Sequence, residues 1–278
     1  MNILALPGDG IGPEITAVAV QALERLDKRF ALGLHFETRD VGLASLKKSG
    51  TTFPDAVQAA CRAADGIVLG PVSHHDYPPR AQGGLNPSGD LRIALDLYAN
   101  IRPSKCYEGI PHYGRTPMDL VIVRENTEGF YADRNMHQGI AEFMPTPDLA
   151  LSVRKISAHA SRRIAQAAFR LARRRRCKVT AVHKINVLKM TEALFLREVR
   201  NVAQEYKDVA YEEQLVDSMA ATGRGLLPVA LGSGIMWLVG DWTVFKFETY
   251  RISTDLRREY ASTYRTYHNS YVIQYVLL

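Results

Sequence analysis

Three arginines stand beside apolar stretches that the sequence predicts to be buried. Arg92 and Arg102 belong to the segment LRIALDLYANIRP, and Arg124 follows in VIVREN. A buried guanidinium needs an anionic partner, and three that converge on one cavity would bind a di- or tricarboxylate through paired hydrogen bonds. Three separate structural ion pairs explain the same residues equally well.

A phenol, an amine and a carboxylate further along the chain could do acid–base and metal chemistry. Tyr131, in RENTEGFY, is either an acid or a core residue whose hydroxyl is satisfied. Lys184, in VHKINVLK, follows an apolar strand, where it is either a general base or an ordinary exposed lysine. Asp217, in LVDSMAA, lies at a strand–helix junction, where it either caps the helix or binds a hard divalent cation.

A glycine-rich turn, GDGIG at residues 8–12, leads into a predicted helix. Backbone N–H groups in such a turn can approach a phosphate or a carboxylate. The spacing is GxGxG and differs from the dinucleotide-binding GxGxxG, so an ordinary tight turn fits equally well.

The elements that position these residues alternate between short apolar runs and segments with helical periodicity, which predicts an α/β fold with parallel strand pairing. A Pro-, Gly- and His-rich stretch at 71–88 is predicted to be a binding loop. The predicted strands are 2–6, 34–36, 66–70, 98–102, 120–124, 179–183 and 209–216. Two predicted helices begin at Pro13 and at Pro54, and three others span 89–97, 148–173 and 187–206.

The bulk composition favours a globular protein and no nucleic-acid or membrane partner. The net charge is +6, but 29 carboxylates are mixed among 35 Lys and Arg, and the basic run Arg173–Arg176 is short. Three separated cysteines without metal-ligand spacing suggest a reducing, cytoplasmic location. We expect no secretory signal, and the apolar stretch 225–240 is too short and interrupted to span a bilayer.

Five segments occur together in a characteristic order. They are GDGIGPE, LDLYANIRP, IVRENTEGFY, HKINVLK and LVDSMA, and with them residues 1–220 resemble the isocitrate and isopropylmalate dehydrogenase family. The resemblance implies a parallel or mixed sheet flanked by helices, with a second α/β domain. The expected domains are 1–99, on the cofactor and substrate side, and 100–221, with the catalytic residues and the dimer interface, followed by a divergent tail at 222–278.

The resemblance also implies roles for individual residues. Arg92, Arg102 and Arg124 would bind the malate moiety, Tyr131 and Lys184 would form the acid–base pair, and Asp217 would bind a metal ion. Lys184 and Asp217 would serve the neighbouring subunit's site, which implies a homodimer. The residues expected to contact the nicotinamide half of the cofactor are Ile11, Gly70, Pro71, Val72 and Asn186.

The activity implied by the resemblance is oxidative decarboxylation of a 3-substituted malate with NAD or NADP and Mg²⁺ or Mn²⁺. Asn86 and Ser88, just before Arg92, would contact the substituent, and their polarity favours a polar group there. Isocitrate, homoisocitrate, 3-isopropylmalate and tartrate are the candidate substrates.

The tail departs from the family pattern. After VDSMAA the resemblance calls for a segment with two further metal-binding aspartates, and residues 222–278 lack it. A truncated or frameshifted, catalytically impaired relative is therefore one alternative, and a non-catalytic regulatory subunit is another.

Overall fold

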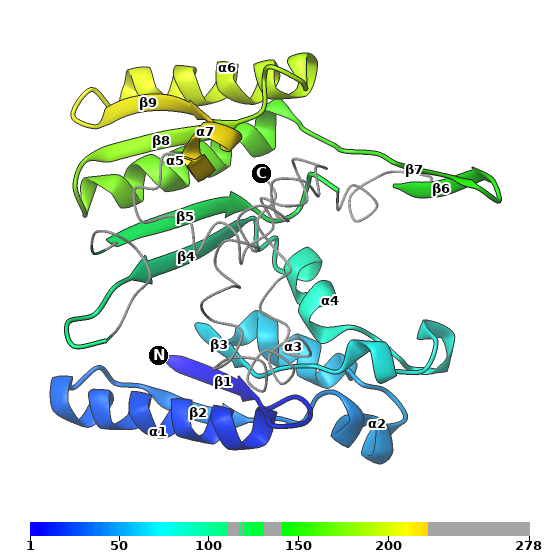
Figure 1. The fold of residues 1–278 in the computed structure, drawn as a ribbon. Helices are drawn as coiled ribbons and strands as arrows, with labels where there is room; N and C mark the ends of the chain where they lie inside the picture. The colour runs from blue at the N-terminus through cyan, green and yellow to red at the C-terminus, as the bar shows by residue number, and fades with distance from the viewer. Residues whose placement is uncertain (111–116, 118, 131–140, 222–278) are drawn as a thin grey trace, which may run out of the picture. The chain divides into compact units, whose positions relative to one another are not determined.

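The computed structural model describes residues 1–110, 117, 119–130 and 141–221. Contacts within the chain divide it into two compact units, Met1–Leu97 and Tyr98–Leu278, and each is described by itself (Figure 1). Both units combine strands with helices, which confirms the predicted α/β class. Among the described residues no helix has both the length and the hydropathy to cross a membrane.

The first unit is built on a parallel sheet of three strands in the order β2-β1-β3. β1 (Asn2–Leu6) lies in the middle and pairs with β2 (His35–Thr38) on one side and with β3 (Gly66–Leu69) on the other. Its last three residues are buried, as expected for a strand with neighbours at both edges. The predicted strands and their parallel pairing are therefore confirmed in this unit.

Four helices surround this sheet: α1 (Gly12–Phe30), α2 (Leu43–Ser49), α3 (Asp55–Ala63) and α4 (Pro87–Ala94). The loop predicted at 71–88 contains only two short 3-10 turns before α4 begins. The buried residues that form the hydrophobic core of this unit are Leu4, Leu6, Val41, Phe53, Val57, Cys61 and Leu91.

Among its described residues the second unit contains three pairs of strands, and helices pack against two of these pairs (Figure 1). β4 (Ala99–Lys105) and β5 (Asp119–Glu125) are antiparallel, whereas β8 (Lys178–His183) and β9 (Ala210–Leu215) are parallel. The helices are α5 (Ala158–Arg173), α6 (Lys189–Glu205) and α7 (Val216–Ala221). The core of this unit consists of Ala165, Phe169, Ala172, Ala181, Leu196, Val199, Val202 and Val209.

The helix predicted over 148–173 is wrong in its first third. β7 (Leu149–Ser152) instead pairs with β6 (Glu142–Thr146) as an antiparallel hairpin, and α5 begins only at Ala158. The start of α5 is fixed by Ser157, whose hydroxyl accepts a hydrogen bond from Ala160 N at 3.2 Å. The alternating leucines of β7 follow the period of a strand, which the helical interpretation overlooked.

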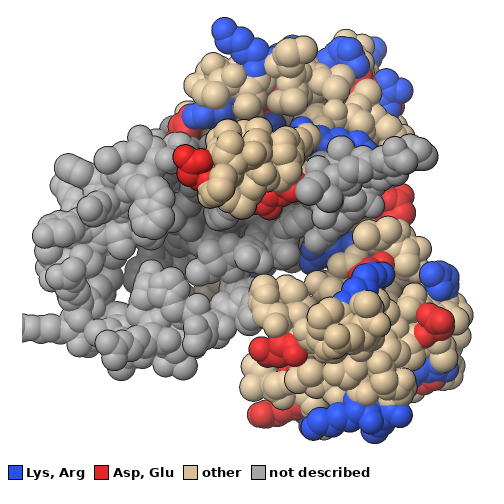
Figure 2. All heavy atoms as spheres, turned by 90° about the vertical axis from the view of Figure 1, so that its right-hand side faces the viewer, with Lys and Arg blue, Asp and Glu red and all other residues tan. Residues whose placement is uncertain are grey.

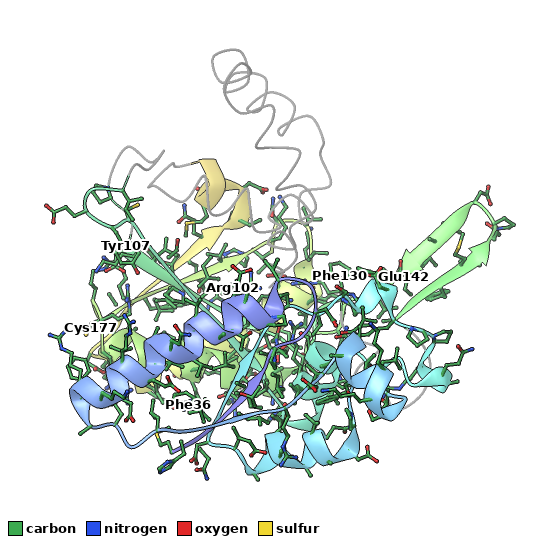
Figure 3. The ribbon with its side chains drawn as sticks, turned by 90° about the horizontal axis from the view of Figure 1, so that it is seen from below. Phe36, Arg102, Tyr107, Phe130, Glu142 and Cys177 are labelled. Carbon is green, nitrogen blue, oxygen red and sulfur yellow. The ribbon has the colours of Figure 1, made fainter. Side chains whose placement is uncertain are left out.

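The β6–β7 hairpin is exposed along its whole length. It carries large apolar side chains on its surface, including Phe143, Met144, Leu149 and Leu151. Figure 3 shows Glu142, its first residue, at the base of the hairpin. A two-stranded hairpin of this kind is marginally stable by itself in water.

Candidate active site

The glycine-rich turn of the first unit packs directly against the segment that follows β3. Gly8 has φ +76°, and a Cβ there would lie 2.1 Å from the carbonyl oxygen of Pro71. Asp9 N donates a hydrogen bond to the same oxygen at 2.7 Å. The structure therefore brings the turn that contains Ile11 to the segment Gly70–Val72, beyond the carboxyl ends of β1 and β3, where open α/β sheets bind ligands.

Asp9 joins this turn to two other loops. Asp9 is 7% exposed, and its carboxylate accepts hydrogen bonds from Leu43 N at 2.7 Å, from Ser73 N at 2.9 Å and from the hydroxyl of Tyr77. Burial, and next the bond to Asp9, raises the pKa of Tyr77. Sequence reasoning missed Asp9, although a carboxylate between two glycines in a tight turn is a signal for such a role.

Asn86, Ser88 and Arg92 all belong to the start or the body of α4. Asn86 is the N-cap residue, and its side-chain oxygen accepts a hydrogen bond from Gly89 N at 3.2 Å. The amide group of Asn86 therefore has a structural role in addition to the predicted contact with substrate. Arg92 lies in the last turn of the helix and is only partly buried.

Arg102 and Arg124 lie on one face of the β4–β5 pair. Asn100 is directly opposite Arg124, and Arg102 follows Asn100 by two residues, so all three side chains emerge on the same side. Arg102 Nε donates to Asn100 Oδ1 at 3.0 Å, and Figure 3 labels Arg102 on β4.

The prediction that all three arginines are buried is wrong for two of them. Arg124 is 2% exposed, whereas Arg92 and Arg102 are partly buried. Arg92 ends a short helix and Arg102 lies on a strand whose side chains alternate between partly buried and exposed, so local apolar neighbours did not imply full burial.

The turn after β5 is held by its own acidic side chain. The carboxylate of Glu125 accepts hydrogen bonds from Thr127 N at 2.7 Å, from the Thr127 hydroxyl at 2.7 Å and from Glu128 N at 2.6 Å. Arg163 Nη2 lies 3.3 Å from the same carboxylate. This turn leads towards Tyr131, the predicted acid, which lies outside the described residues.

Glu128 links the same turn to the beginning of α5. It accepts hydrogen bonds from Ser157 N and from the Ser157 hydroxyl, both at 2.8 Å. Sequence reasoning missed both glutamates of the motif RENTEGFY. Glu125 is bonded within the motif itself, whereas the partner of Glu128, Ser157, is distant along the chain. The two glutamates therefore hold the turn and join it to α5.

Lys184 and Asp217 form an ion pair where β8 and β9 end. The Lys184 side chain is 13% exposed and that of Asp217 is 39% exposed, but Asp217 Oδ1 is buried and has no hydrogen-bond partner among the described residues. Asn186 follows Lys184 and is exposed. The two parallel strands thus bring together an amine and a carboxylate that are far apart in the sequence.

A buried ion pair supports the backbone of Lys184. Arg154 Nη1 lies 2.6 Å from Glu192 Oε1, and the two side chains are 8% and 2% exposed. The second oxygen of Glu192 accepts a hydrogen bond from Lys184 N at 3.3 Å. Neither residue was singled out from the sequence, because Arg154 lay inside the helix that was wrongly predicted.

The chemistry around Asp217 fits a hard divalent cation. A buried carboxylate oxygen without a protein donor is a suitable ligand for Mg²⁺ or Mn²⁺. In the part of the chain that the structure describes, however, no three His, Cys, Asp or Glu side chains group together as a metal site would require. Asp217 therefore offers one protein ligand, and substrate and water would supply others.

The model of the isocitrate/isopropylmalate dehydrogenase family matches residues 2–222. The chain belongs to this family. It is 36% identical to the 3-isopropylmalate dehydrogenase of Archaeoglobus fulgidus over 218 residues, covering 78% of this chain and 60% of that protein. With the same enzyme from Methanothermobacter thermautotrophicus the identity is 38% over 221 residues, covering 79% and 61%.

Solved structures of the family have the same fold. The crystal structure of isocitrate dehydrogenase from Methylococcus capsulatus superposes with a TM-score of 0.66 at 37% identity and covers 81% of this chain and 64% of its own. The predicted family and fold are therefore confirmed. The chain spans about 60% of the length of these curated relatives.

Proposed function

We propose that this chain catalyses the oxidative decarboxylation of a 3-substituted malate with NAD or NADP and Mg²⁺ or Mn²⁺. The observation that carries the proposal is the pair formed by Lys184 and Asp217 at the ends of two parallel strands. It puts a proton acceptor beside a ligand for a divalent cation, and the reaction needs both. The names of the family and of its members agree with this class of reaction.

Each residue of the proposed site has a defined task in the reaction. Arg102 and Arg124 share one face of a strand pair and would hold the carboxylates of the substrate, together with Arg92. Lys184 would take the proton of the C2 hydroxyl, and Tyr131 would return a proton after carbon dioxide has left. When bound, the nicotinamide accepts a hydride, and the divalent cation offsets the negative charge that develops on the substrate.

The cofactor would lie against the glycine-rich turn of the first unit. Ile11 and Gly70–Val72 lie together there, because Gly8 approaches the backbone of Pro71 closely, and backbone N–H groups of such a turn can approach a phosphate. Asn186 would contact the same cofactor from its exposed position after Lys184. The polar groups of Asn86 and Ser88 favour a substrate with a polar 3-substituent, as in isocitrate.

We further propose a homodimer with shared active sites. The exposed β6–β7 hairpin supports this assembly, because its apolar side chains and short strands gain most from pairing with a second copy.

Basic and acidic side chains both occur on the coloured surface in Figure 2, in agreement with the mixed charges of the sequence. No nucleic-acid or membrane partner is proposed, and the cysteine pattern favours the cytoplasm.

The test is reduction of NAD⁺ and NADP⁺ by the full chain with Mn²⁺ and a panel of isocitrate, homoisocitrate, 3-isopropylmalate, tartrate and malate. We expect turnover with one or two of these acids.

Lys184→Met should lower kcat by about 10²- to 10⁴-fold, the usual contribution of a general base. Lys189→Met, an exposed lysine in the next helix, is the matched control and should retain activity. Equal activity of the two variants would remove Lys184 from the reaction, and no turnover with any acid would contradict the proposal.

A further inference from the structure

The loop that carries Lys184 is held by hydrogen bonds on both sides of this residue. The carbonyl oxygen of Lys184 accepts hydrogen bonds from Val187 N at 3.0 Å and from Leu188 N at 2.9 Å. Lys184 N donates to Glu192 Oε2 at 3.3 Å. The first two bonds close a local turn, whereas the third reaches a side chain of α6. Glu192 therefore ties the backbone of the lysine to a helix.

Glu192 in turn joins this backbone to Arg154. Its other oxygen, Oε1, lies 2.6 Å from Arg154 Nη1, and both side chains are almost completely buried. Arg154 Nη1 also donates to the hydroxyl of Thr191 at 3.3 Å, so the arginine contacts two neighbouring residues near the start of α6. The carboxylate thus serves two donors, with one oxygen for each.

Arg154 belongs to the segment 153–157, which leads from β7 to α5 (Figure 1). This segment is bonded to the turn of the motif RENTEGFY. Lys155 N donates to the carbonyl oxygen of Gly129, and Gly129 N donates to that of Lys155, both at 2.9 Å. Ser157 donates to the same turn through its backbone N–H and its hydroxyl. The segment is therefore fixed to this turn at two points.

Arg154 and Lys155 are adjacent in the segment but have partners in different places. Arg154 pairs with Glu192 of α6, whereas Lys155 Nζ lies 3.7 Å from Glu128 Oε1. Successive side chains of an extended chain point to opposite sides, so one short segment can hold two others. The segment 153–157 connects the loop after β8 with the turn after β5.

We propose that Arg154 and Glu192 are positioning residues for Lys184, and that the segment 153–157 fixes this lysine relative to the turn that precedes Tyr131. Neither Arg154 nor Glu192 touches substrate in this scheme. The inference rests on the proposed function, in which Lys184 takes a proton from the acid to which Tyr131 returns one. Two groups that act on one small molecule must be held precisely, because a displacement of about 1 Å can cost about 100-fold in rate.

Glu192→Gln breaks the proposed connection with little change in shape. An amide has one acceptor oxygen and a donor NH₂ group, so it cannot accept at both ends as the carboxylate does. Its oxygen should stay with Arg154, and its NH₂ group would then face Lys184 N. We expect kcat to fall by about 10- to 100-fold, while KM stays nearly unchanged because the substrate-binding arginines are untouched.

Glu198→Gln is the matched control. Glu198 lies in the same helix, is almost completely buried and bonds to Arg162 of α5 and to Arg197. Its replacement also removes a buried charge beside an arginine, but at a place that is not bonded to Lys184. This variant should retain kcat at a temperature at which circular dichroism shows all variants to be folded.

Amide hydrogen exchange gives a readout that does not require turnover. A peptide that covers 183–186 should exchange about tenfold faster in Glu192→Gln than in the unchanged chain, because Lys184 N loses its acceptor and the loop opens locally. The same peptide should stay protected in Glu198→Gln. Peptides from β9 report global unfolding of the second unit and serve as the reference.

Lys155→Pro tests the other end of the connection. Proline removes the N–H that donates to Gly129 without touching Glu192 or Lys184, and it should lower kcat to a similar extent. Lys155→Met keeps the backbone bond and loses only a partly exposed charge, so it is the control and should retain kcat.

The outcomes separate this inference from the proposed function. Absence of turnover in the unchanged chain would contradict the function itself and with it any role in positioning. In an active chain, an unchanged kcat in Glu192→Gln, or equal losses in Glu192→Gln and Glu198→Gln, would overturn the positioning role alone. Equal exchange of the 183–186 peptide in these two variants would also overturn it, and full activity of Lys155→Pro would overturn the role of the segment 153–157.

Discussion

Arg154 and Glu192 form an ion pair that is almost completely removed from solvent and lies beside the backbone of Lys184. Its nitrogen and oxygen are 2.6 Å apart. A buried charge is costly unless a charge of opposite sign lies beside it. Loss of one partner therefore leaves the other buried without compensation.

We expect Arg154→Met and Glu192→Met each to lower the free energy of unfolding by about 3–5 kcal/mol, the usual cost of breaking a buried pair. The double variant should lose less than the sum, because it removes both charges. The exposed pair formed by Arg39 and Glu37 is the control, and its removal should cost about 1 kcal/mol or less. Urea unfolding monitored by circular dichroism measures these differences, and additive losses would show that the two residues do not depend on one another.

Gly8 and Gly10 share a positive φ but differ in their surroundings. A Cβ at Gly8 would lie 2.1 Å from a backbone oxygen, whereas one at Gly10 would meet nothing within 4 Å. Gly10→Ala should therefore cost about 1 kcal/mol of conformational strain, and Gly8→Ala should cost about 2 kcal/mol more, because backbone atoms must move. Thermal unfolding of the two variants compares them, and equal losses would show that the contact with Pro71 is not tight.

Glu198 is buried between two arginines of α5 and α6. Hydrogen bonds from Arg162, at 2.7 and 3.0 Å, are the main reason that its pKa lies below the ordinary 4.5. Because the folded-state pKa is depressed, the pair stabilises the fold above about pH 4.5, and this contribution disappears as the pH falls through the folded-state pKa.

The stability difference between the unchanged chain and Glu198→Gln should accordingly be largest near pH 7 and should shrink below pH 4.5. Glu205→Gln, an exposed position of the same helix, is the control and should show little change across this range. Urea midpoints measured at intervals of pH test the prediction, and a difference that grows on acidification would contradict it.

The β6–β7 hairpin gives a prediction about assembly. Phe143→Glu places a charge on an exposed apolar strand and should shift the proposed dimer to monomer in sedimentation experiments. Ile110→Glu changes a more exposed apolar residue outside the hairpin and should leave the proposed dimer intact. A dimer that survives Phe143→Glu would show that the hairpin is not the interface.

The sequence was sufficient for most helices and strands, because each is an apolar run bounded by Gly, Pro or polar residues. β1 and β3 are examples, since both end at glycine-containing loops that fix their lengths. The segment at 148–157 was misjudged because the pairing that makes β7 a strand comes from β6, which lies outside the segment itself. Strand pairing between exposed segments leaves little trace in local hydrophobicity.

The site was predictable only for residues in distinctive motifs. Lys184 and Asp217 could be named from the sequence, and the structure adds that they touch. Glu192 could not be named, because its importance lies in Arg154, a partner that is distant along the chain. Its side chain looks like an ordinary surface carboxylate until this partner is known.

The two units contain separate hydrophobic cores, one around Phe53 and the other around Phe169. Heating therefore need not produce one cooperative transition, and a calorimetric trace of this protein should be fitted as the sum of two peaks. A ligand that contacts only the glycine-rich turn would then move one peak and leave the other in place, so the shape of the trace would report which half of the molecule had been engaged.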